Sequence, residues 1–148
     1  LTVNIAAGHS QTVTNNTFTK IVDWTELHSN VIGFDGTNDK FVAPATGVYL
    51  VTARAEWDTG TLSVTTHTYQ FITAIYKNGS LYHRAGESCE NTYVAKGVAV
   101  TNIMSLSATD YIEIYGFCRD DDDASSSDNV TLRENDGDYS FWSVVRLS

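Results

Sequence analysis

The densest group of side chains that could do chemistry is an acidic segment, residues 119–137, near the C-terminus. Together with the aspartate just after it, the segment offers seven carboxylates as candidate ligands: Asp120, Asp121, Asp122, Asp123, Asp128, Asp136 and Asp138. Calcium takes about six to eight oxygen ligands, many of them carboxylates. The segment lacks the turning glycine and the flanking helices of the helix–loop–helix calcium motif, and adjacent carboxylates repel one another. Two interpretations stay open, a calcium site and a solvated acidic loop, and no cofactor is required.

The groups that can act as bases or nucleophiles do not form a recognisable catalytic motif. The four histidines are scattered along the chain, at His9, His28, His67 and His83. Gly8-His9-Ser10 lacks the flanking glycines and the following helix of a nucleophile elbow. Glycine-rich phosphate loops and CxxC metal motifs are also absent from the sequence. We therefore expect that this protein is not an enzyme.

Two cysteines, Cys89 and Cys118, allow one disulfide bond. Closing a loop of this length would stabilise the fold by about 3–4 kcal/mol in the chain-entropy view. The alternative is a pair of reduced thiols at strand ends. The sequence leaves both alternatives open.

Length and charge restrict the class of protein. The chain has 148 residues and a formal net charge of −9, which suits one domain spanning 1–148 and argues against nucleic-acid binding. No apolar run is long enough to cross a membrane, so membrane insertion is not expected. The chain begins at Leu1 rather than methionine, so we expect a piece excised from a longer protein.

One stretch, Phe41 to Trp57, organises the predicted elements. After the single proline, Pro44, its residues alternate strictly. One face is wholly apolar, with Tyr49, Val51, Ala53, Ala55 and Trp57, and predicts a core-facing strand. The other face carries Val48, Leu50, Thr52, Arg54 and Glu56, and is too apolar for open water. A second cover, such as another subunit, would explain it.

Further short strands are predicted on both sides of this stretch. An N-terminal strand and polar arm, residues 1–22, precede a short strand at Val31–Phe34. The later strands are expected at Tyr69–Tyr76, Leu81–Ala85, Val94–Leu106, Asp110–Phe117, Val130–Leu132 and Tyr139–Leu147, with a loop at Gly86–Thr92. Lys77-Asn78-Gly79-Ser80 predicts a tight hairpin turn. Because no amphipathic helix is predicted, the fold class is all-β, an antiparallel sandwich of two sheets with about ten strands.

Four motifs in order resemble the globular head domain of complement component 1q, which is allied in fold to the tumour-necrosis-factor ligands. They are Phe41-x-x-Pro44-x-x-Gly47-Val48-Tyr49, Tyr76-Lys77-Asn78-Gly79, Leu106-x-x-x-Asp110-Tyr111-Ile112 and Phe141-Trp142-Ser143-Val144-Val145-Arg146-Leu147. The similarity spans roughly Thr12 to Leu147. The 148 residues contain no collagen-like Gly-X-Y repeat, and the Asp120–Asp123 run is unusual for the family. The arm around Thr17–Lys20 looks more like the phage and bacterial branch.

The resemblance implies a jelly roll that packs as a compact homotrimer, with one sheet of each subunit facing its neighbours. The implied interface candidates are Val48, Leu50, Arg54, Glu56, Tyr115, Phe117, Trp142 and Val144. Aromatic residues beside loops, Tyr82 and Tyr93, are the candidates for receptor binding, because exposed rings can stack on sugars.

The resulting hypothesis is a trimeric binding head of a phage fibre or virion surface protein. Its partners would be further copies of itself and a cell-surface glycan or protein receptor, and its location the virion surface or extracellular space. Two alternatives stay open, a structural cement or trimerisation module and a secreted complement-like recognition domain.

Overall fold

The alternating stretch forms β7 (Gly47–Asp58), the longest strand among the described residues. The computed structural model describes residues 2–5, 10–28, 32–59, 67–90, 95–122, 129–133 and 139–148. Along β7, Tyr49, Val51, Ala53, Ala55 and Trp57 are all fully buried, whereas Val48, Leu50, Thr52 and Arg54 are partly exposed. The predicted division of this strand into a core face and an outer face is therefore confirmed.

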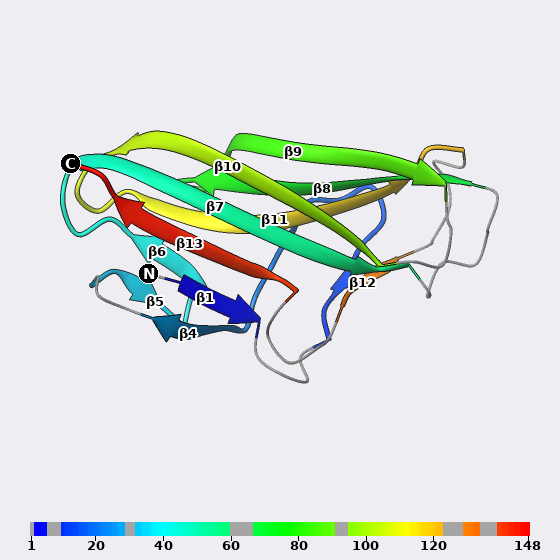
Figure 1. The fold of residues 1–148 in the computed structure, drawn as a ribbon, viewed down its shortest axis with the longest axis horizontal. Coiled ribbons are helices and arrows are strands. Elements are labelled where there is room, and N and C mark those ends of the chain that lie inside the picture. The colour runs from blue at the N-terminus through cyan, green and yellow to red at the C-terminus, as the bar shows by residue number, and fades with distance from the viewer. Residues whose placement is uncertain are drawn as a thin grey trace.

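The described residues form two antiparallel sheets and no helix (Figure 1). The seven-stranded sheet contains β1 (Thr2–Ile5), β2 (Thr12–Val13), β4 (Trp24–His28), β7, β10 (Lys96–Leu106), β12 (Val130–Leu132) and β13 (Phe141–Arg146). The six-stranded sheet contains β3 (Thr19–Lys20), β5 (Phe34–Asp35), β6 (Lys40–Val42), β8 (Thr68–Lys77), β9 (Ser80–Glu90) and β11 (Tyr111–Asp120). The predicted all-β sandwich is confirmed, with more strands than the ten expected because several are very short.

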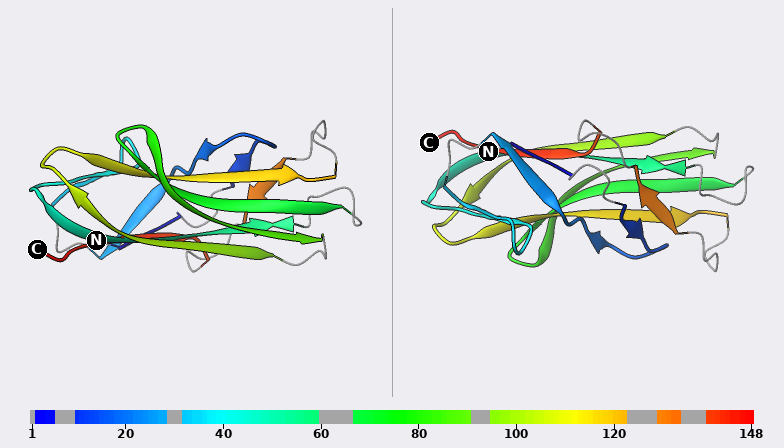
Figure 2. Two further views of the ribbon diagram at one scale, coloured as in Figure 1. Left: turned by 90° about the horizontal axis from the view of Figure 1, so that it is seen from above. Right: turned by 90° about the horizontal axis from the view of Figure 1, so that it is seen from below.

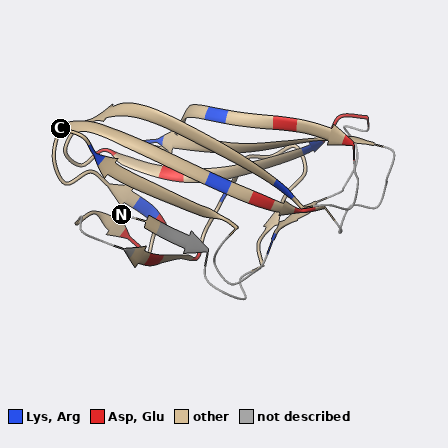
Figure 3. Cartoon of the chain, viewed as in Figure 1, with Lys and Arg blue, Asp and Glu red and all other residues tan. Residues whose placement is uncertain are grey.

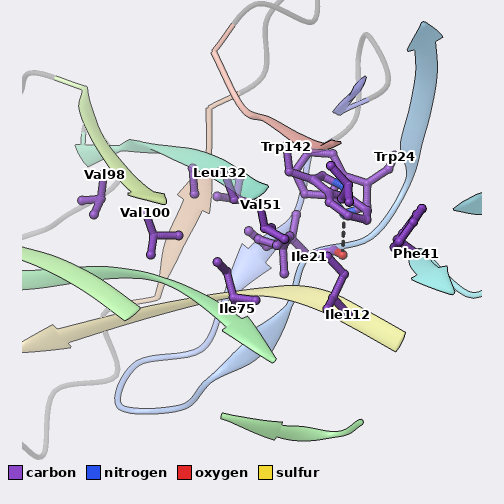
Figure 4. Close-up of a cluster of buried hydrophobic side chains, with 14 of the residues drawn as sticks. Ile21, Trp24, Phe41, Val51, Ile75, Val98, Val100, Ile112, Leu132 and Trp142 are labelled. Carbon is purple, nitrogen blue, oxygen red and sulfur yellow. Dashed lines mark hydrogen bonds between the residues drawn. The ribbon is translucent and has the colours of Figure 1, made fainter. Parts of the chain in front are cut away.

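The two sheets lie face to face, as the edge-on views show (Figure 2). Side chains from both inner faces fill the space between them, which is how a β-sandwich builds its core. Figure 4 shows part of this core, in which the Trp24 indole donates a 2.9 Å hydrogen bond to the Ile21 carbonyl. The ring of Trp24 also meets the ring of Trp142 edge-on, with centroids 6.3 Å apart.

The hairpin between β8 and β9 turns where the sequence predicts it. Asn78 and Gly79 have φ angles of 51° and 76°, the left-handed values that a primed two-residue turn requires. The side-chain amide of Asn78 donates a 2.8 Å hydrogen bond to the Asp110 carboxylate. This bond and the Ser107 backbone N–H lower the pKa of Asp110 to about 2. The turn is thus tied to the loop before β11.

Some predicted boundaries are wrong. The segment Gly86–Thr92 was expected to be a loop, but β9 pairs with β8 as far as Glu90, so Cys89 lies in a strand. Pairing with a long neighbouring strand outweighs the local turn preference of Gly86 and Ser88. Of the strand expected at Val31–Phe34, Val31 lies outside the described residues, and Ile32 and Gly33 lie in a turn in which Gly33 has a φ of 145°. Only Phe34 belongs to a strand, β5.

The N-terminal arm contacts both sheets, as its β-favouring composition suggested. Strand β2 pairs with β12 in the seven-stranded sheet, and β3 pairs with β11 in the six-stranded sheet. Gln11 fixes the arm between them, because its side chain donates to the Lys20 carbonyl and accepts from the Val22 N–H. The arm therefore closes one side of the sandwich.

Candidate functional site

The outer face of the seven-stranded sheet carries an exposed apolar row. Leu50 on β7 lies opposite Ile103 on β10 and Val145 on β13. Residues directly opposite one another point to the same side of a sheet. Ile103 is 62% exposed and Val145 is 49% exposed, so this three-residue row (the apolar row) faces solvent in the single chain. Of the predicted interface residues, Val48 and Leu50 lie on this face.

Beside the apolar row runs a row of hydroxyl groups. Thr52 lies opposite Thr101 on one side and Ser143 on the other. The two threonine hydroxyls are 3.2 Å apart and hydrogen-bonded. The face is therefore banded, with branched aliphatic side chains next to small polar ones.

The predicted roles of Trp142 and Val144 in a subunit interface are wrong. Both side chains are buried inside the chain, at 0% and 1% exposure. The inward residues of β13 lie opposite the inward residues of β7, with Trp142 facing Ala53 and Val144 facing Val51. Period-2 alternation in the sequence showed that the strand has two faces, but the pairing with β7 decides which face is inside.

Glu56 is also buried within the chain rather than free for a partner. Its side chain is 5% exposed and accepts a 2.7 Å hydrogen bond from the Arg133 guanidinium. A second ion pair joins it to Arg54. Gly97 makes room for Arg54, because a Cβ at this position would collide with the guanidinium. A buried carboxylate needs such compensation, so Arg54 and Glu56 form an internal ion-pair network.

The ring of Tyr139 closes this network from outside. The Arg133 guanidinium carbon lies 4.4 Å from the ring centroid, and Arg54 donates to the Tyr139 carbonyl. The Ser140 hydroxyl oxygen accepts a 2.9 Å hydrogen bond from the Glu56 backbone N–H. Figure 3 shows neighbouring basic and acidic bands on β7 at this place. The sequence shows no signal for Arg133, which is distant from Glu56 along the chain.

Tyr115 and Phe117, the other predicted interface residues, lie on the opposite sheet. They project from the outer face of β11 and pack with Ile72, Phe18 and Tyr76. Phe18 of the arm covers Phe117, with ring centroids 4.8 Å apart, so Phe117 is 8% exposed. One flat interface cannot include both these residues and the apolar row, because the whole sandwich separates them.

The two receptor-binding candidates have different outcomes. Tyr82 lies on β9 with 47% of its surface exposed, so its predicted role stays a prediction. Tyr93 lies outside the described residues.

Three of the seven aspartates predicted as calcium ligands are described, and each accepts hydrogen bonds from the protein. Asp120 is 1% exposed, and its carboxylate Oδ2 lies 2.7 Å from Nδ1 of His67. Asp121 pairs with Arg119. Asp122 accepts a 2.6 Å hydrogen bond from the Thr68 N–H. The remaining four, Asp123, Asp128, Asp136 and Asp138, lie outside the described residues.

Within the described residues no group of three or more histidine, cysteine or acidic side chains is arranged to hold a metal. The calcium site therefore stays a prediction.

Of the two alternatives for Cys89 and Cys118, the disulfide bond is not formed. Cys89 lies opposite Tyr69 on one side of β8, and Cys118 lies opposite Phe71 on the other side. Neighbouring strands are about 4.8 Å apart, so two residues across an intervening strand are too distant for a disulfide. Both cysteines are free thiols, which is the reduced alternative.

No helix among the described residues is long and apolar enough to cross a membrane.

Comparison with known proteins identifies the fold. No family model matches the chain, and no curated protein matches it. Among solved structures, Eiger TNF from S. frugiperda aligns with a TM-score of 0.67 at 14% identity, covering 99% of this chain and 90% of that one. Murine APRIL aligns with TM-scores of 0.64 at pH 5.0 and 0.63 at pH 8.5, at 14% identity, covering 99% of this chain and 98% of the other. The chain therefore has a TNF-like jelly-roll fold.

Proposed function

We propose that this chain is a head domain that assembles as a homotrimer and recognises a cell-surface receptor, a glycan or a protein. Its parent would be a phage fibre or virion surface protein, acting at the virion surface or in the extracellular space. The observation that carries the proposal is the apolar row of Leu50, Ile103 and Val145 on the outer face of the seven-stranded sheet. Such a row is unfavourable in water and favourable when a second copy covers it.

The fold and the sequence resemblance support three copies. The jelly roll is TNF-like, and the complement component 1q heads that the sequence resembles pack as trimers around one axis. In a ring of three, each subunit meets its neighbours through two different surfaces. A flat apolar face on one subunit and a sheet edge on the next would satisfy this requirement. Three weak receptor sites on one rigid head would then bind together with avidity.

Charge substitution in the apolar row tests the assembly. We expect the wild-type domain to have three times the chain mass by light scattering at low micromolar concentration. Leu50→Asp and Ile103→Asp should give monomers, because each of the three equivalent interfaces would then bury an unpaired carboxylate. Ile32→Asp is a matched control, since Ile32 is 88% exposed and lies before β5 in the other sheet. A monomeric wild type would contradict the trimer.

The rival proposal is a structural cement or trimerisation module, which the apolar row supports equally well. The two functions are separated by binding of the isolated, fluorescently labelled domain to candidate host cells. Saturable binding that unlabelled domain competes away supports receptor recognition. A trimer that binds no cell, together with particles that fall apart when they lack the domain, supports the structural role. A secreted complement-like recognition domain is the third alternative, and binding to soluble rather than cell-surface targets would favour it.

A further inference from the structure

A pair of stacked tyrosines lies on the outer face of the six-stranded sheet, the side opposite the apolar row. Tyr76 on β8 and Tyr115 on β11 have ring centroids 3.9 Å apart and an interplanar angle of 21°. Both rings are partly exposed. Burial raises the pKa of both phenols, so they stay protonated and can donate hydrogen bonds at neutral pH.

Arg84 shares this face. It lies on β9 directly opposite Ala74, which in turn lies opposite Tyr115. Ala74 is small and fully buried, and it belongs with Ile72 and Phe117 to the cluster against which both tyrosines pack. Arg84 itself is exposed. Two residues further along β9 on the same face stands Gly86, which has no side chain to crowd the guanidinium.

The cations of the six-stranded sheet are otherwise neutralised by carboxylates. Four have acidic partners, in the pairs Lys20–Glu113, Lys40–Asp35, Lys77–Asp110 and Arg119–Asp121. Arg84 has no ion pair with any residue in the described part of the chain. Lys96 and Arg146 in the seven-stranded sheet also lack a described carboxylate partner, but among the described cations of the six-stranded sheet only the charge of Arg84 is left for an anionic ligand.

We propose that Arg84, Tyr76 and Tyr115 form a binding site for an acidic sugar residue, one that carries a carboxylate or a sulfate group. The guanidinium fork matches the two oxygens of such an anion and can donate two parallel hydrogen bonds. The phenol hydroxyls donate to or accept from the sugar hydroxyls. Leu81, which lies opposite Tyr76 and is 44% exposed, supplies apolar surface for the ring carbons.

The surroundings favour a saccharide over a protein partner. Protein hot spots lie at the centre of a large patch whose rim excludes water. Here the apolar neighbours Ile72, Phe18 and Phe117 pack against one another beside the tyrosines. Polar residues flank this small cluster, with the Lys20–Glu113 pair on one side and Gln70 and Ser88 on the other. A small, partly exposed site fits one charged sugar unit. Its low affinity would be offset by the three copies of the proposed trimer, so this inference rests on the proposed receptor-binding function.

The test is a glycan array probed with the labelled domain, carrying matched pairs of sialylated and asialo glycans and of sulfated and unsulfated glycans. We expect binding to the acidic member of a pair and not to its neutral partner. Arg84→Gln should weaken this binding at least about tenfold, since a charge-assisted contact is lost. Arg84→Lys should recover part of it, because the charge returns without the fork.

Lys96→Gln is the matched control, since it removes one cation from β10, which belongs to the other sheet. This variant should bind the acidic glycans within about twofold of the wild type. All variants should keep the wild-type melting temperature, because both substituted positions lie at the protein surface. Equal binding to neutral and acidic glycans, or full binding by Arg84→Gln, overturns the proposal.

The array also separates this inference from the proposed function. If no glycan binds but the domain binds cells in a protease-sensitive manner, the acidic-sugar site is wrong and receptor binding stands. If neither glycans nor cells bind, both are wrong.

Discussion

Cys118 shows how strongly one residue's surroundings determine its chemistry. Its thiol is fully buried and donates a weak hydrogen bond to the Val13 carbonyl, with 3.5 Å between sulfur and oxygen. Burial raises its pKa to about 11. Burial also raises the pKa of Cys89, which is only half-buried. Because the thiolate is the reactive form, both thiols should react slowly with electrophiles, and Cys118 should react more slowly than Cys89.

Thiol labelling of the native domain checks this expectation. At pH 8, Cys89 should react with iodoacetamide at least about tenfold faster than Cys118, since it is both more exposed and easier to ionise. The rate at each cysteine should rise with pH, because more thiolate forms as the pH approaches the pKa. Peptide mapping after timed quenching measures the two rates separately. Equal rates, or an intact mass that changes on reduction, would contradict the free, buried thiol.

Strand β13 shows that pairing with its neighbour, and not local composition, decides which face of a strand is buried. Both faces of Phe141–Arg146 contain bulky residues, so composition does not distinguish them. Its register with β7 places Trp142 opposite Ala53, and the small alanine leaves room for the indole. The Trp142 ring then meets Phe34 and Trp24 at centroid distances of 6.1 and 6.3 Å. This strand is therefore a core element with an outward face of Phe141, Ser143 and Val145.

Neighbouring substitutions in β13 distinguish the two faces. Trp142→Ala should lower the free energy of unfolding by about 3–5 kcal/mol, because it removes a fully buried indole and leaves a cavity. Ser143→Ala, one residue along and pointing outward, should change it by less than about 0.5 kcal/mol. Urea unfolding followed by tryptophan fluorescence and by circular dichroism measures both. The interface role first predicted for Trp142 requires the opposite result, a stable monomer that no longer assembles.

On the scale of the whole molecule, the two sheets present outer faces of different character. The seven-stranded sheet exposes branched aliphatic residues around Leu50, whereas the six-stranded sheet exposes stacked tyrosines and Arg84. Charged residues are spread along the described strands as separate bands and do not form one basic stripe (Figure 3). This arrangement suits a domain that uses one face for its own copies and leaves the other for a ligand.

The calcium prediction also belongs to the assembled molecule. A homotrimer would carry three copies of the seven predicted aspartates, and a bound cation would relieve their mutual repulsion. Millimolar calcium should therefore raise the melting temperature, and a chelator should reverse the rise, because a ligand that binds the folded state stabilises it. Sodium chloride at matched ionic strength controls for screening. The double variant Asp123→Asn with Asp128→Asn should respond less. No shift with calcium would leave only the solvated acidic loop.

The sequence by itself determined the fold class and the core face of β7, because period-2 alternation and turn chemistry are local properties of the chain. Tyr49 to Trp57, the Asn78-Gly79 turn and β12 could all be predicted from short windows of residues. The apolar outer face of β7 was predictable for the same reason, and it led directly to the Leu50 row.

Only the tertiary structure decided which residues meet across strands. It placed Trp142 inside, separated Cys89 from Cys118 by one strand, and joined Arg133 to Glu56. It also set Arg84 beside the stacked tyrosines, a grouping with no signal in the sequence because its members come from three strands. Such contacts depend on strand order and register, which long-range pairing fixes, and a shift of one residue exchanges the buried and exposed faces of a whole strand.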